Sequence, residues 1–364
     1  MKTLFDSIDL GRLPVKNRIV RSATYEYLPA ELPGEGEETL IARYGALAAG
    51  GVGAIITGMM GINGDSHVVP MMSKPYCYGH EDPSFDAAFA NIMNAVHAHG
   101  SKLVVQINHC GIKLGPYDDG SIPLGPSDLE LVPGRPGRAM SDYEIDQTVR
   151  DFAEAALQSK SSGADGVQLH AAHGYLLSQF LSPHFNKRTD QYGGPIENRA
   201  RFLLRVATRV RATLGATFPL WVKINATDLE DESITLEECI WVCKALEEIG
   251  IDAIEVTGGL GNGKRSSPSR IVKSEADEGS FTAQAEAVAK AVSIPVISVG
   301  GYRSPQVLER VLNESDIAAI SMARPLLSEP GLVARWQKGD IAPARCISCN
   351  RCFGQPLTCK AFAD

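Results

Sequence analysis

Two imidazoles and a phenol lie within the short run His170-Ala171-Ala172-His173-Gly174-Tyr175. A pair of histidines can hold a carbonyl oxygen and stabilise negative charge that develops on it. A tyrosine beside such a pair is a natural proton donor. The alternative is structural, with His170 packed at the end of a strand and His173 capping a helix. The pairing, together with Tyr175, favours chemistry over packing.

Lys223 is the one charge in the apolar run LWVKIN, residues 220–225. A buried ammonium without a partner is costly, so this side chain must reach one. Three interpretations stay open: an amine nucleophile that forms a Schiff base, a fixed cation that stabilises an anionic cofactor, and a salt bridge inside the fold.

Two segments near the C-terminus, SVGGYRSP (298–305) and ISMARPLLSEP (320–330), place small residues between a predicted strand and a predicted helix. Backbone N–H groups at a helix start bind phosphate, and glycine lets the phosphate approach closely. Ordinary tight turns are the alternative. The predicted phosphate-binding residues are Gly300, Gly301, Ala323 and Arg324.

Eight short apolar runs alternate with helical patterns and predict the elements that position these residues. The predicted strands are 17–22, 53–58, 102–107, 166–170, 220–225, 253–257, 295–299 and 317–321. The predicted helices include 84–98, 142–159, 198–214 and 236–249. This order predicts an α/β fold, a (β/α)8 TIM barrel with its site at the C-terminal strand ends, where Gln106, His170, Lys223 and Asn225 lie. An open doubly wound sheet is disfavoured because no G-x-G-x-x-G turn follows Ser22.

The ends of the chain and two long connections complete the predicted layout. Residues 8–10 and 13–15 predict an N-terminal hairpin that closes the bottom of the barrel. The connections 108–140 and 258–280 are expected as loops over the site that select the substrate, and Lys264 and Arg265 in the second suggest an anionic group. We expect a barrel domain over 1–340 and a short Cys-rich C-terminal tail over 341–364.

Composition narrows the classes of partner. The 364 residues carry a net charge of −8 with no basic block, so nucleic acid is not expected. The N-terminus does not resemble a signal peptide, and no run approaches the roughly 20 apolar residues of a membrane helix. We therefore expect a cytoplasmic protein without membrane contact that acts on a small molecule. The residues at the predicted strand ends include no cluster of three carboxylates and no His-Glu pair at metal spacing, which disfavours a hydrolytic metal site.

The run GVQLHAAHGYLLSQFLSPHFNKRTDQYGG, followed by ENRARFL, resembles the signature of the old yellow enzyme family. The similarity is greatest to the bacterial NADH:flavin oxidoreductase branch, which includes the barrels of 2,4-dienoyl-CoA reductase and trimethylamine dehydrogenase. The segments LPVKNRIVRSATYE, QINHCG, VGGYRSP and MARPLL agree in order, so the resemblance spans about residues 1–340.

The resemblance implies a non-covalent FMN that NAD(P)H reduces and that passes hydride from N5 to an activated C=C bond of an α,β-unsaturated carbonyl compound. By position it implies that Gln106 binds the pyrimidine edge and that Lys223 lies near N1 and O2. It also implies that His170 and His173 polarise the acceptor, that Tyr175 donates the proton, and that the chain forms a homo-oligomer. The residues implied to line the isoalloxazine ring are Ser22, Ala23, Thr24, Tyr25 and Gly58. Family members often have Pro and then Cys or Thr after the first strand. This chain has Ser22-Ala23-Thr24-Tyr25 there, so the resemblance does not say which side chain lies near flavin O4.

The tail contains a cysteine set, C-x2-C-x2-C-x6-C, formed by Cys346, Cys349, Cys352 and Cys359. In the iron–sulfur branch of the family, cysteines beyond the barrel hold a [4Fe–4S] cluster. Here the third spacing is one residue shorter than the C-x2-C-x3-C pattern expected for that branch, the fourth is compressed, and no downstream domain is expected. We therefore expect a remnant tail without metal that packs over a flavin edge or a neighbouring subunit, with a four-cysteine zinc site as a third alternative.

Rival interpretations of the whole chain are an iron–sulfur flavoprotein, a Schiff-base lyase that uses Lys223, and a non-catalytic flavin carrier.

Overall fold

Eight parallel strands close into a barrel in the computed structural model, which describes residues 1–28, 32, 34–63, 83–114, 122–132, 134–261, 267–354 and 357–362. The strands are β3 (Ile19–Arg21), β4 (Ala54–Ile56), β6 (Lys102–Asn108), β10 (Gly166–Ala171), β11 (Leu220–Asn225), β12 (Ala253–Thr257), β13 (Val296–Val299) and β14 (Ala319–Met322). Each pairs with the next, and β6 pairs with both β4 and β10 to close the ring; β5 (Met60–Gly61) adds a short pairing to β6. The predicted TIM barrel and all eight predicted strands are confirmed.

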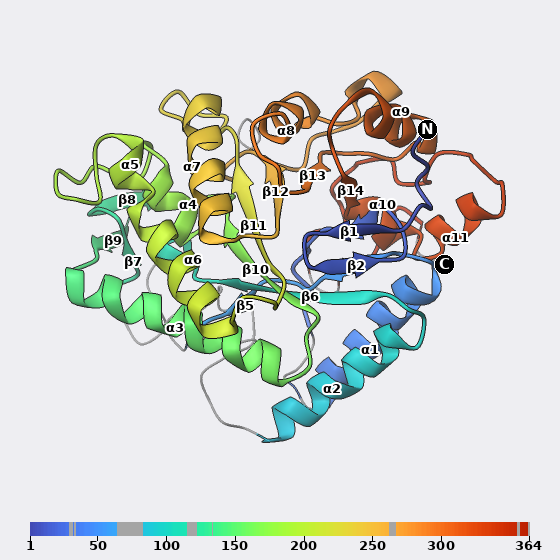
Figure 1. Ribbon diagram of the computed structural model, residues 1–364, viewed down its shortest axis with the longest axis horizontal. Helices are drawn as coiled ribbons and strands as arrows, with labels where there is room; N and C mark the ends of the chain where they lie inside the picture. Colours follow the sequence, from blue (N-terminus) through green and yellow to red (C-terminus); the bar gives the residue numbers. More distant parts are fainter. Residues whose placement is uncertain are drawn as a thin grey trace.

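Helices pack around the outside of the barrel (Figure 1). They are α1 (Glu35–Ala49), α2 (Pro83–His97), α3 (Asp142–Ser161), α4 (Leu176–Leu181), α5 (Ile196–Arg199), α6 (Arg201–Leu214), α7 (Leu236–Ile249), α8 (Thr282–Ala289), α9 (Pro305–Glu314), α10 (Arg324–Ser328) and α11 (Leu332–Gln337). The helix predicted at 198–214 is two helices that meet at Ala200. The helix predicted at 142–159 begins with a capping box, in which Ser141 and Glu144 exchange hydrogen bonds.

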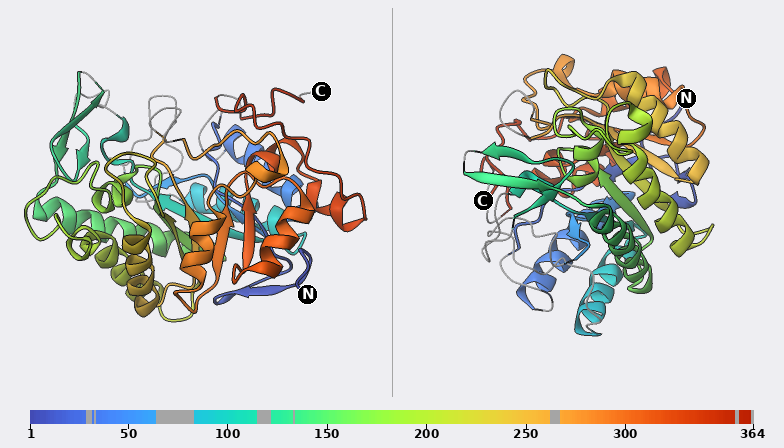
Figure 2. Two further views of the ribbon diagram at one scale, coloured as in Figure 1. Left: turned by 90° about the horizontal axis from the view of Figure 1, so that it is seen from above. Right: turned by 90° about the vertical axis from the view of Figure 1, so that its left-hand side faces the viewer.

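The predicted hairpin is confirmed as β1 (Ile8–Leu10) and β2 (Leu13–Val15), which pair antiparallel. Its apolar side chains join inward-facing strand residues such as Trp221 in a separate buried cluster. The hairpin lies at one end of the barrel, and the C-terminal tail lies at the other (Figure 2). Apolar packing therefore fills the bottom of the barrel and leaves the C-terminal strand ends for polar residues.

The connection 108–140, expected to be a loop, contains regular structure in its described parts. These elements are η2 (Gly111–Leu114) and the three-stranded sheet of β7 (Leu124–Gly125), β8 (Leu129–Val132) and β9 (Arg135–Ala139). The second connection, 258–280, contains the short η3 (Glu275–Asp277). Lys264 and Arg265 lie outside the described residues.

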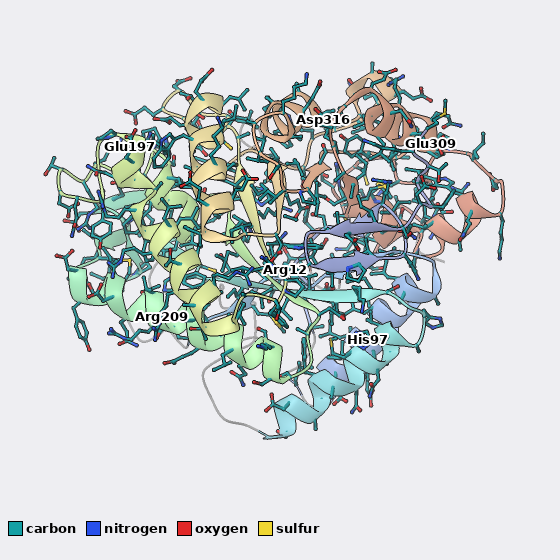
Figure 3. All side chains as sticks on the ribbon, in the orientation of Figure 1. Arg12, His97, Glu197, Arg209, Glu309 and Asp316 are labelled. Carbon is teal, nitrogen blue, oxygen red and sulfur yellow. The ribbon has the colours of Figure 1, made fainter. Side chains whose placement is uncertain are left out.

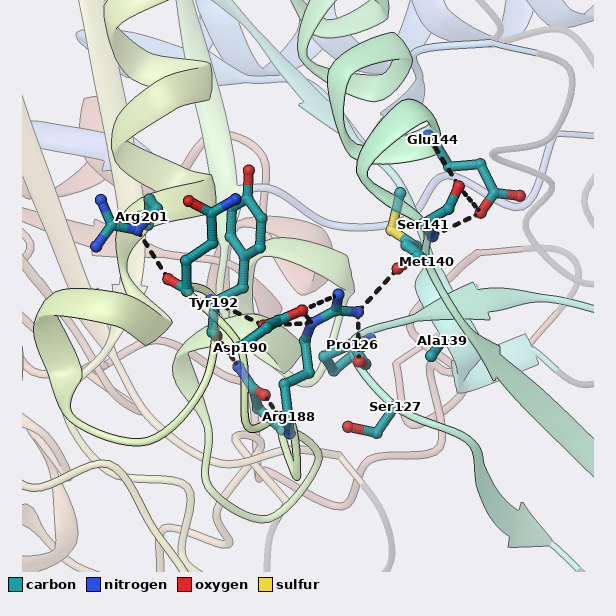
Figure 4. Close-up of polar contacts among 12 residues, drawn as sticks. Pro126, Ser127, Ala139, Met140, Ser141, Glu144, Arg188, Asp190, Tyr192 and Arg201 are labelled. Carbon is teal, nitrogen blue, oxygen red and sulfur yellow. Dashed lines mark hydrogen bonds and ion pairs between the residues drawn. The ribbon is translucent and has the colours of Figure 1, made fainter.

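Arg188 attaches the small sheet to the barrel (Figure 4). Its guanidinium donates to the carbonyls of Pro126 and Met140, at 3.1 Å and 2.8 Å, and is paired with Asp190 at 2.5 Å. Carbonyl groups are obligatory acceptors, so this contact satisfies backbone that the sheet leaves unpaired. The NKRTDQYGG part of the signature thus fixes the connection that follows β6.

Charged side chains of both signs lie around the outside of the molecule. Figure 3 labels Glu197, Arg209, Glu309 and Asp316 on the outer helices and loops, and Arg12 at the hairpin. Within the described ranges, none of the helices combines the length and the hydropathy that a membrane crossing requires.

Candidate active site

A cavity of about 300 Å³ lies at the C-terminal strand ends. This volume is within the range of small-molecule sites. All but one of the predicted catalytic and cofactor-binding residues line it. Those that do are Ser22, Ala23, Thr24, Tyr25, Gln106, His170, His173, Tyr175, Lys223, Gly300, Gly301, Ala323 and Arg324.

The exception is Gly58, which does not line the cavity. Its N–H donates to the hydroxyl of Tyr44 at 3.2 Å, and a Cβ atom at this position would lie 2.9 Å from the carbonyl oxygen of Thr24. Gly58 therefore lies behind the 22–25 segment, where the lack of a side chain lets that segment pack closely.

His170, His173 and Tyr175, here called the His–Tyr cluster, come together where β10 ends. The His170 ring lies 5.4 Å from the His173 ring and 4.9 Å from the Tyr175 ring, measured between centroids. His173 takes a left-handed backbone conformation with φ 59°, and its N–H donates to Asn225 Oδ1 at 3.2 Å. This turn brings the second imidazole back beside the first.

The protonation states of the His–Tyr cluster suit hydrogen bonding to a neutral acceptor. Burial, with the nearby Lys223 ammonium, lowers the pKa of both His170 and His173 well below the usual value. Burial raises the pKa of the Tyr175 phenol. At neutral pH the two imidazoles are uncharged and Tyr175 keeps its proton. His170 Nδ1 is buried without a hydrogen-bond partner in the described part of the chain, which an incoming ligand would relieve.

Lys113, in η2, supports the His–Tyr cluster from outside the cavity and was missed from the sequence. Its Nζ donates to the carbonyls of His173, at 2.5 Å, and Leu260, at 2.8 Å. The same atom lies 4.4 Å from the centroid of the Tyr175 ring, and burial lowers the Lys113 pKa to about 8. One ammonium therefore ties together the segments that follow β6, β10 and β12.

Lys223 belongs to a second group of polar residues, here called the Glu255 cluster. Its members are Ser22, Gln168, Lys223, Glu255 and Ser321. Lys223 Nζ donates to Ser22 Oγ at 2.8 Å and is paired with Glu255 Oε1 at 3.2 Å. The salt bridge considered for Lys223 is therefore present, while the side chain also lines the cavity.

Glu255 and Gln168 were not anticipated as site residues. Glu255 stands in the middle of AIEVT, an apolar run like that of Lys223, so the same argument about a buried charge applies to it. Lys223 and Glu255 lie directly opposite each other in the β11–β12 register. The sequence showed a charged residue within each of two apolar strands, but only the register of the strands shows that these two residues pair.

Gly301 and Arg324 lie at the predicted phosphate end. Gly301 has φ 79°, and a Cβ atom there would lie 2.6 Å from Val272 Cγ2. Arg324 donates to Asn350 Oδ1 at 2.7 Å and to the carbonyl of Arg270 at 2.9 Å. A glycine is required at 301, and Arg324 connects the cavity to the C-terminal tail.

The C-terminal tail packs against the cavity. Cys352, Phe353 and Leu357 line it, and Ala344 belongs to the main core. The four tail cysteines line a second, smaller cavity of about 20 Å³ that shares Arg324, Leu327 and Cys352 with the first. As the side chains stand, no three His, Cys, Asp or Glu residues in the described ranges are arranged to hold a single metal ion.

Acid pH is expected to destabilise the protein through its buried neutral imidazoles. Burial lowers the His109 pKa to about 4, and its Nδ1 accepts the Gly111 N–H at 3.0 Å. Because this pKa lies below the unfolded value, the unfolded state binds more protons between pH 6.5 and 4, and stability falls as the pH drops. His109 alone should cost about 2 kcal/mol at pH 5 relative to pH 7.

Urea unfolding at pH 7 and pH 5 measures this loss. His109→Asn can replace the acceptor, because an Asn side chain also reaches the N–H two residues on, but it does not titrate. The variant should lose correspondingly less stability at pH 5, whereas His99→Asn at an exposed site should behave as the parent. Equal acid sensitivity of His109→Asn and the parent would contradict the assignment.

The barrel and its cavity define a barrel enzyme of the old yellow enzyme class. The chain belongs to the NADH:flavin oxidoreductase / NADH oxidase family, whose sequence model matches residues 3–341. The family resemblance inferred from the signature is therefore confirmed.

Individual relatives agree with this assignment. The chain is 33% identical to NADH oxidase of Thermoanaerobacter brockii, over 96% of this chain and 53% of the relative. It is 29% identical to cinnamate reductase of Clostridium sporogenes, over 97% of this chain and 56% of the relative. The structure of the old yellow enzyme homologue from Zymomonas mobilis superposes with a TM-score of 0.76 at 26% identity, covering 94% of each chain. The chain spans about half the length of several curated relatives that it matches.

Proposed function

We propose that this chain binds FMN and uses NAD(P)H to reduce a C=C bond conjugated to a carbonyl group. The observation that carries the proposal is the convergence of two neutral imidazoles and a protonated phenol in the same cavity as Lys223 and Gln106. Hydride acceptors of this kind need donors at the oxygen and a proton at the carbon.

The residues present fit FMN. Gly300 and Gly301 present backbone without side chains to the cavity, and Arg324 lines the same end, as a phosphate site requires. His170 Nδ1 lacks a partner among the described residues, as expected for an atom that meets a ligand. Bound FMN would supply the hydride, held by Gln106 and Lys223 at one end and by Gly300, Gly301, Ala323 and Arg324 at the other.

The side chains divide the remaining work. His170 and His173 hold the acceptor oxygen with N–H donors and stabilise the negative charge that develops on it. Tyr175 keeps its proton at neutral pH and delivers it from Oη to the acceptor carbon. Lys113 holds the turn that carries His173 and Tyr175. Cys352, Phe353 and Leu357 cover the cavity and reduce access of water.

An absorbance spectrum of the purified protein, followed by anaerobic NADH or NADPH and then 2-cyclohexen-1-one, tests the proposal. We expect a flavin spectrum that bleaches with the nucleotide and returns with the enone. A colourless protein that does not take up added FMN would instead favour the Schiff-base lyase. A yellow protein that neither nucleotide bleaches would favour a flavin carrier.

Tyr175→Phe is expected to slow enone reduction by about 10²-fold, because the proton must then come from water. Bleaching of the flavin by nucleotide should be unchanged, since that step needs no proton from Tyr175. Stopped-flow measurement of the two half-reactions separates them. Tyr143→Phe, at an exposed tyrosine that does not line the cavity, is the matched control. An unchanged enone step in Tyr175→Phe would assign the proton to another group.

A second candidate is an iron–sulfur flavoprotein, and the cavity lined by all four tail cysteines favours it. A zinc ion draws its thiolates together at about 2.3 Å from one centre, whereas a cluster holds them further apart around its iron ions. All four cysteines border the same cavity, as the ligands of such a cluster would. The chemistry it would supply is single-electron transfer beside Arg324.

Iron and acid-labile sulfide analysis of anaerobically purified protein tests this candidate. A [4Fe–4S] cluster gives about four iron and about four sulfide per chain, which Cys349→Ser should abolish. A remnant tail gives neither, and a zinc site gives zinc without sulfide.

A further inference from the structure

Glu255 is the most connected buried charge at the site, although it is not among the residues that line the cavity. Its side chain is fully buried. Oε1 accepts from Ser22 Oγ at 2.7 Å and Ser321 Oγ at 2.6 Å as well as from Lys223, and Oε2 accepts from Gln168 Nε2 at 3.1 Å. Each oxygen of the carboxylate is thus an acceptor.

The carboxylate is held in its charged form. Burial alone would raise the pKa of Glu255, but the Lys223 ammonium and the hydrogen bonds from Ser321, Ser22 and Gln168 outweigh it and lower the pKa. An ionised carboxylate can only accept hydrogen bonds. Every neighbour must therefore turn a donor toward it.

The carboxylate fixes the amide orientation of Gln168, which in turn fixes that of Gln106. Because Gln168 turns its Nε2 group to Glu255, its Oε1 atom faces the other way and accepts from Gln106 Nε2 at 2.7 Å. Gln106 and Gln168 lie opposite each other in the β6–β10 register, so the contact follows from the barrel. Gln106 therefore turns its acceptor, Oε1, away from Gln168, with the second N–H of Nε2 beside it. Because this series of hydrogen bonds ends on a carboxylate, which can only accept, the orientation of both amides is defined.

Lys223 is ordered by the same carboxylate. Two of its three N–H donors go to Ser22 and Glu255, which leaves one for a ligand in the cavity. The cavity therefore presents an acceptor at Gln106 and a donor at Lys223, from the strands on either side of β10. A ring edge with an N–H next to a carbonyl matches this pattern.

We propose that Glu255 is a positioning residue that sets the hydrogen-bond polarity of the site, turning Gln106 Oε1 and one Lys223 N–H toward the pyrimidine edge of FMN. The inference rests on the proposed FMN function and adds to it a residue that does not touch the cofactor. Reversal of the amide of Gln106 would bring two donors face to face at the ring N–H, so polarity governs affinity.

Binding of FMN and of 3-deaza-FMN to the apoprotein, measured by flavin fluorescence, tests the proposal without turnover. The deaza analogue has a carbon atom in place of N3 at nearly the same size, so it lacks the ring N–H donor. We expect the parent to bind FMN at least about tenfold more tightly than the analogue, the loss of one buried hydrogen bond. Glu255→Gln, which can turn an amide donor to Gln168, should reduce this preference below about threefold and weaken FMN binding.

Gln168→Met covers the case in which Glu255→Gln does not fold. It breaks the path to Gln106 but keeps the Lys223–Glu255 pair, so it should also lose the preference for FMN. Gln306→Met, at an exposed glutamine, should keep the parental preference. A folded Glu255→Gln or Gln168→Met protein with the parental preference would overturn the role of Glu255. A parent that binds both compounds equally would overturn the Gln106 contact, and one that binds neither would overturn the FMN site itself.

Discussion

Replacing His170 and His173 together by alanine is expected to reduce enone turnover by at least about 10³-fold while FMN stays bound. The two imidazoles are the neutral donors that share the cavity with Tyr175, and their pKa values lie well below the usual range. Loss of one donor to a developing oxyanion costs about 10²–10³-fold in well-studied sites, and here both are lost. The acceptor oxygen would then have no N–H partner from either histidine.

Steady-state assays with 2-cyclohexen-1-one, alongside stopped-flow reduction of the flavin by nucleotide, measure the two halves of the reaction. The nucleotide half should change little, since no acceptor carbonyl is involved. His99→Ala, at an exposed histidine, is the matched control and should be fully active. Enone turnover of the double variant close to that of the parent would refute the role assigned to the pair.

Lys223→Met is expected to destabilise the apoprotein by about 3–5 kcal/mol. Both members of the Lys223–Glu255 pair are almost completely buried, and removal of the ammonium leaves a carboxylate in the barrel without its counter-charge. The hydroxyls of Ser22 and Ser321 and the amide of Gln168 remain as donors, but none of them carries charge. Addition of Glu255→Gln should recover most of the loss, because it removes the unpaired charge.

Urea unfolding of the parent, the two single variants and the double variant completes the cycle. The coupling free energy should be favourable to the pair by at least about 1 kcal/mol. Lys244→Met, at an exposed lysine on α7, should cost less than about 0.5 kcal/mol. A loss in Lys223→Met no larger than that of Lys244→Met would mean that the ion pair contributes nothing to folding.

Local sequence patterns determined most of the barrel. Each strand is a short apolar run because its residues are buried on both faces, and that composition can be recognised without knowledge of the neighbours. The hairpin at 8–15 was equally local, because its two strands are adjacent in the sequence. The His–Tyr cluster was local as well, because His170, His173 and Tyr175 lie within six consecutive residues. Features formed by residues close together in the sequence could therefore be predicted from the sequence alone.

The connection 108–140 was harder to predict, because its strands are short and rich in Gly and Pro. Arg188, which lies far along the chain, donates to the carbonyls of Pro126 and Met140, just beyond the ends of β7 and β9. Local composition predicted a loop, whereas the strand pairings and the contacts with Arg188 depend on the tertiary structure.

The Glu255 cluster was decided by tertiary structure. The sequence required a partner for the Lys223 ammonium, since a buried charge cannot stay unpaired, but it did not say which of the acidic residues would meet it. The β11–β12 register selects Glu255, and closure of the barrel adds Ser22 from the end of β3 and Ser321 from β14. The need for a counter-charge is a property of the residue, whereas its identity is a property of the register, because only the closed barrel brings strands so distant in the chain to one carboxylate.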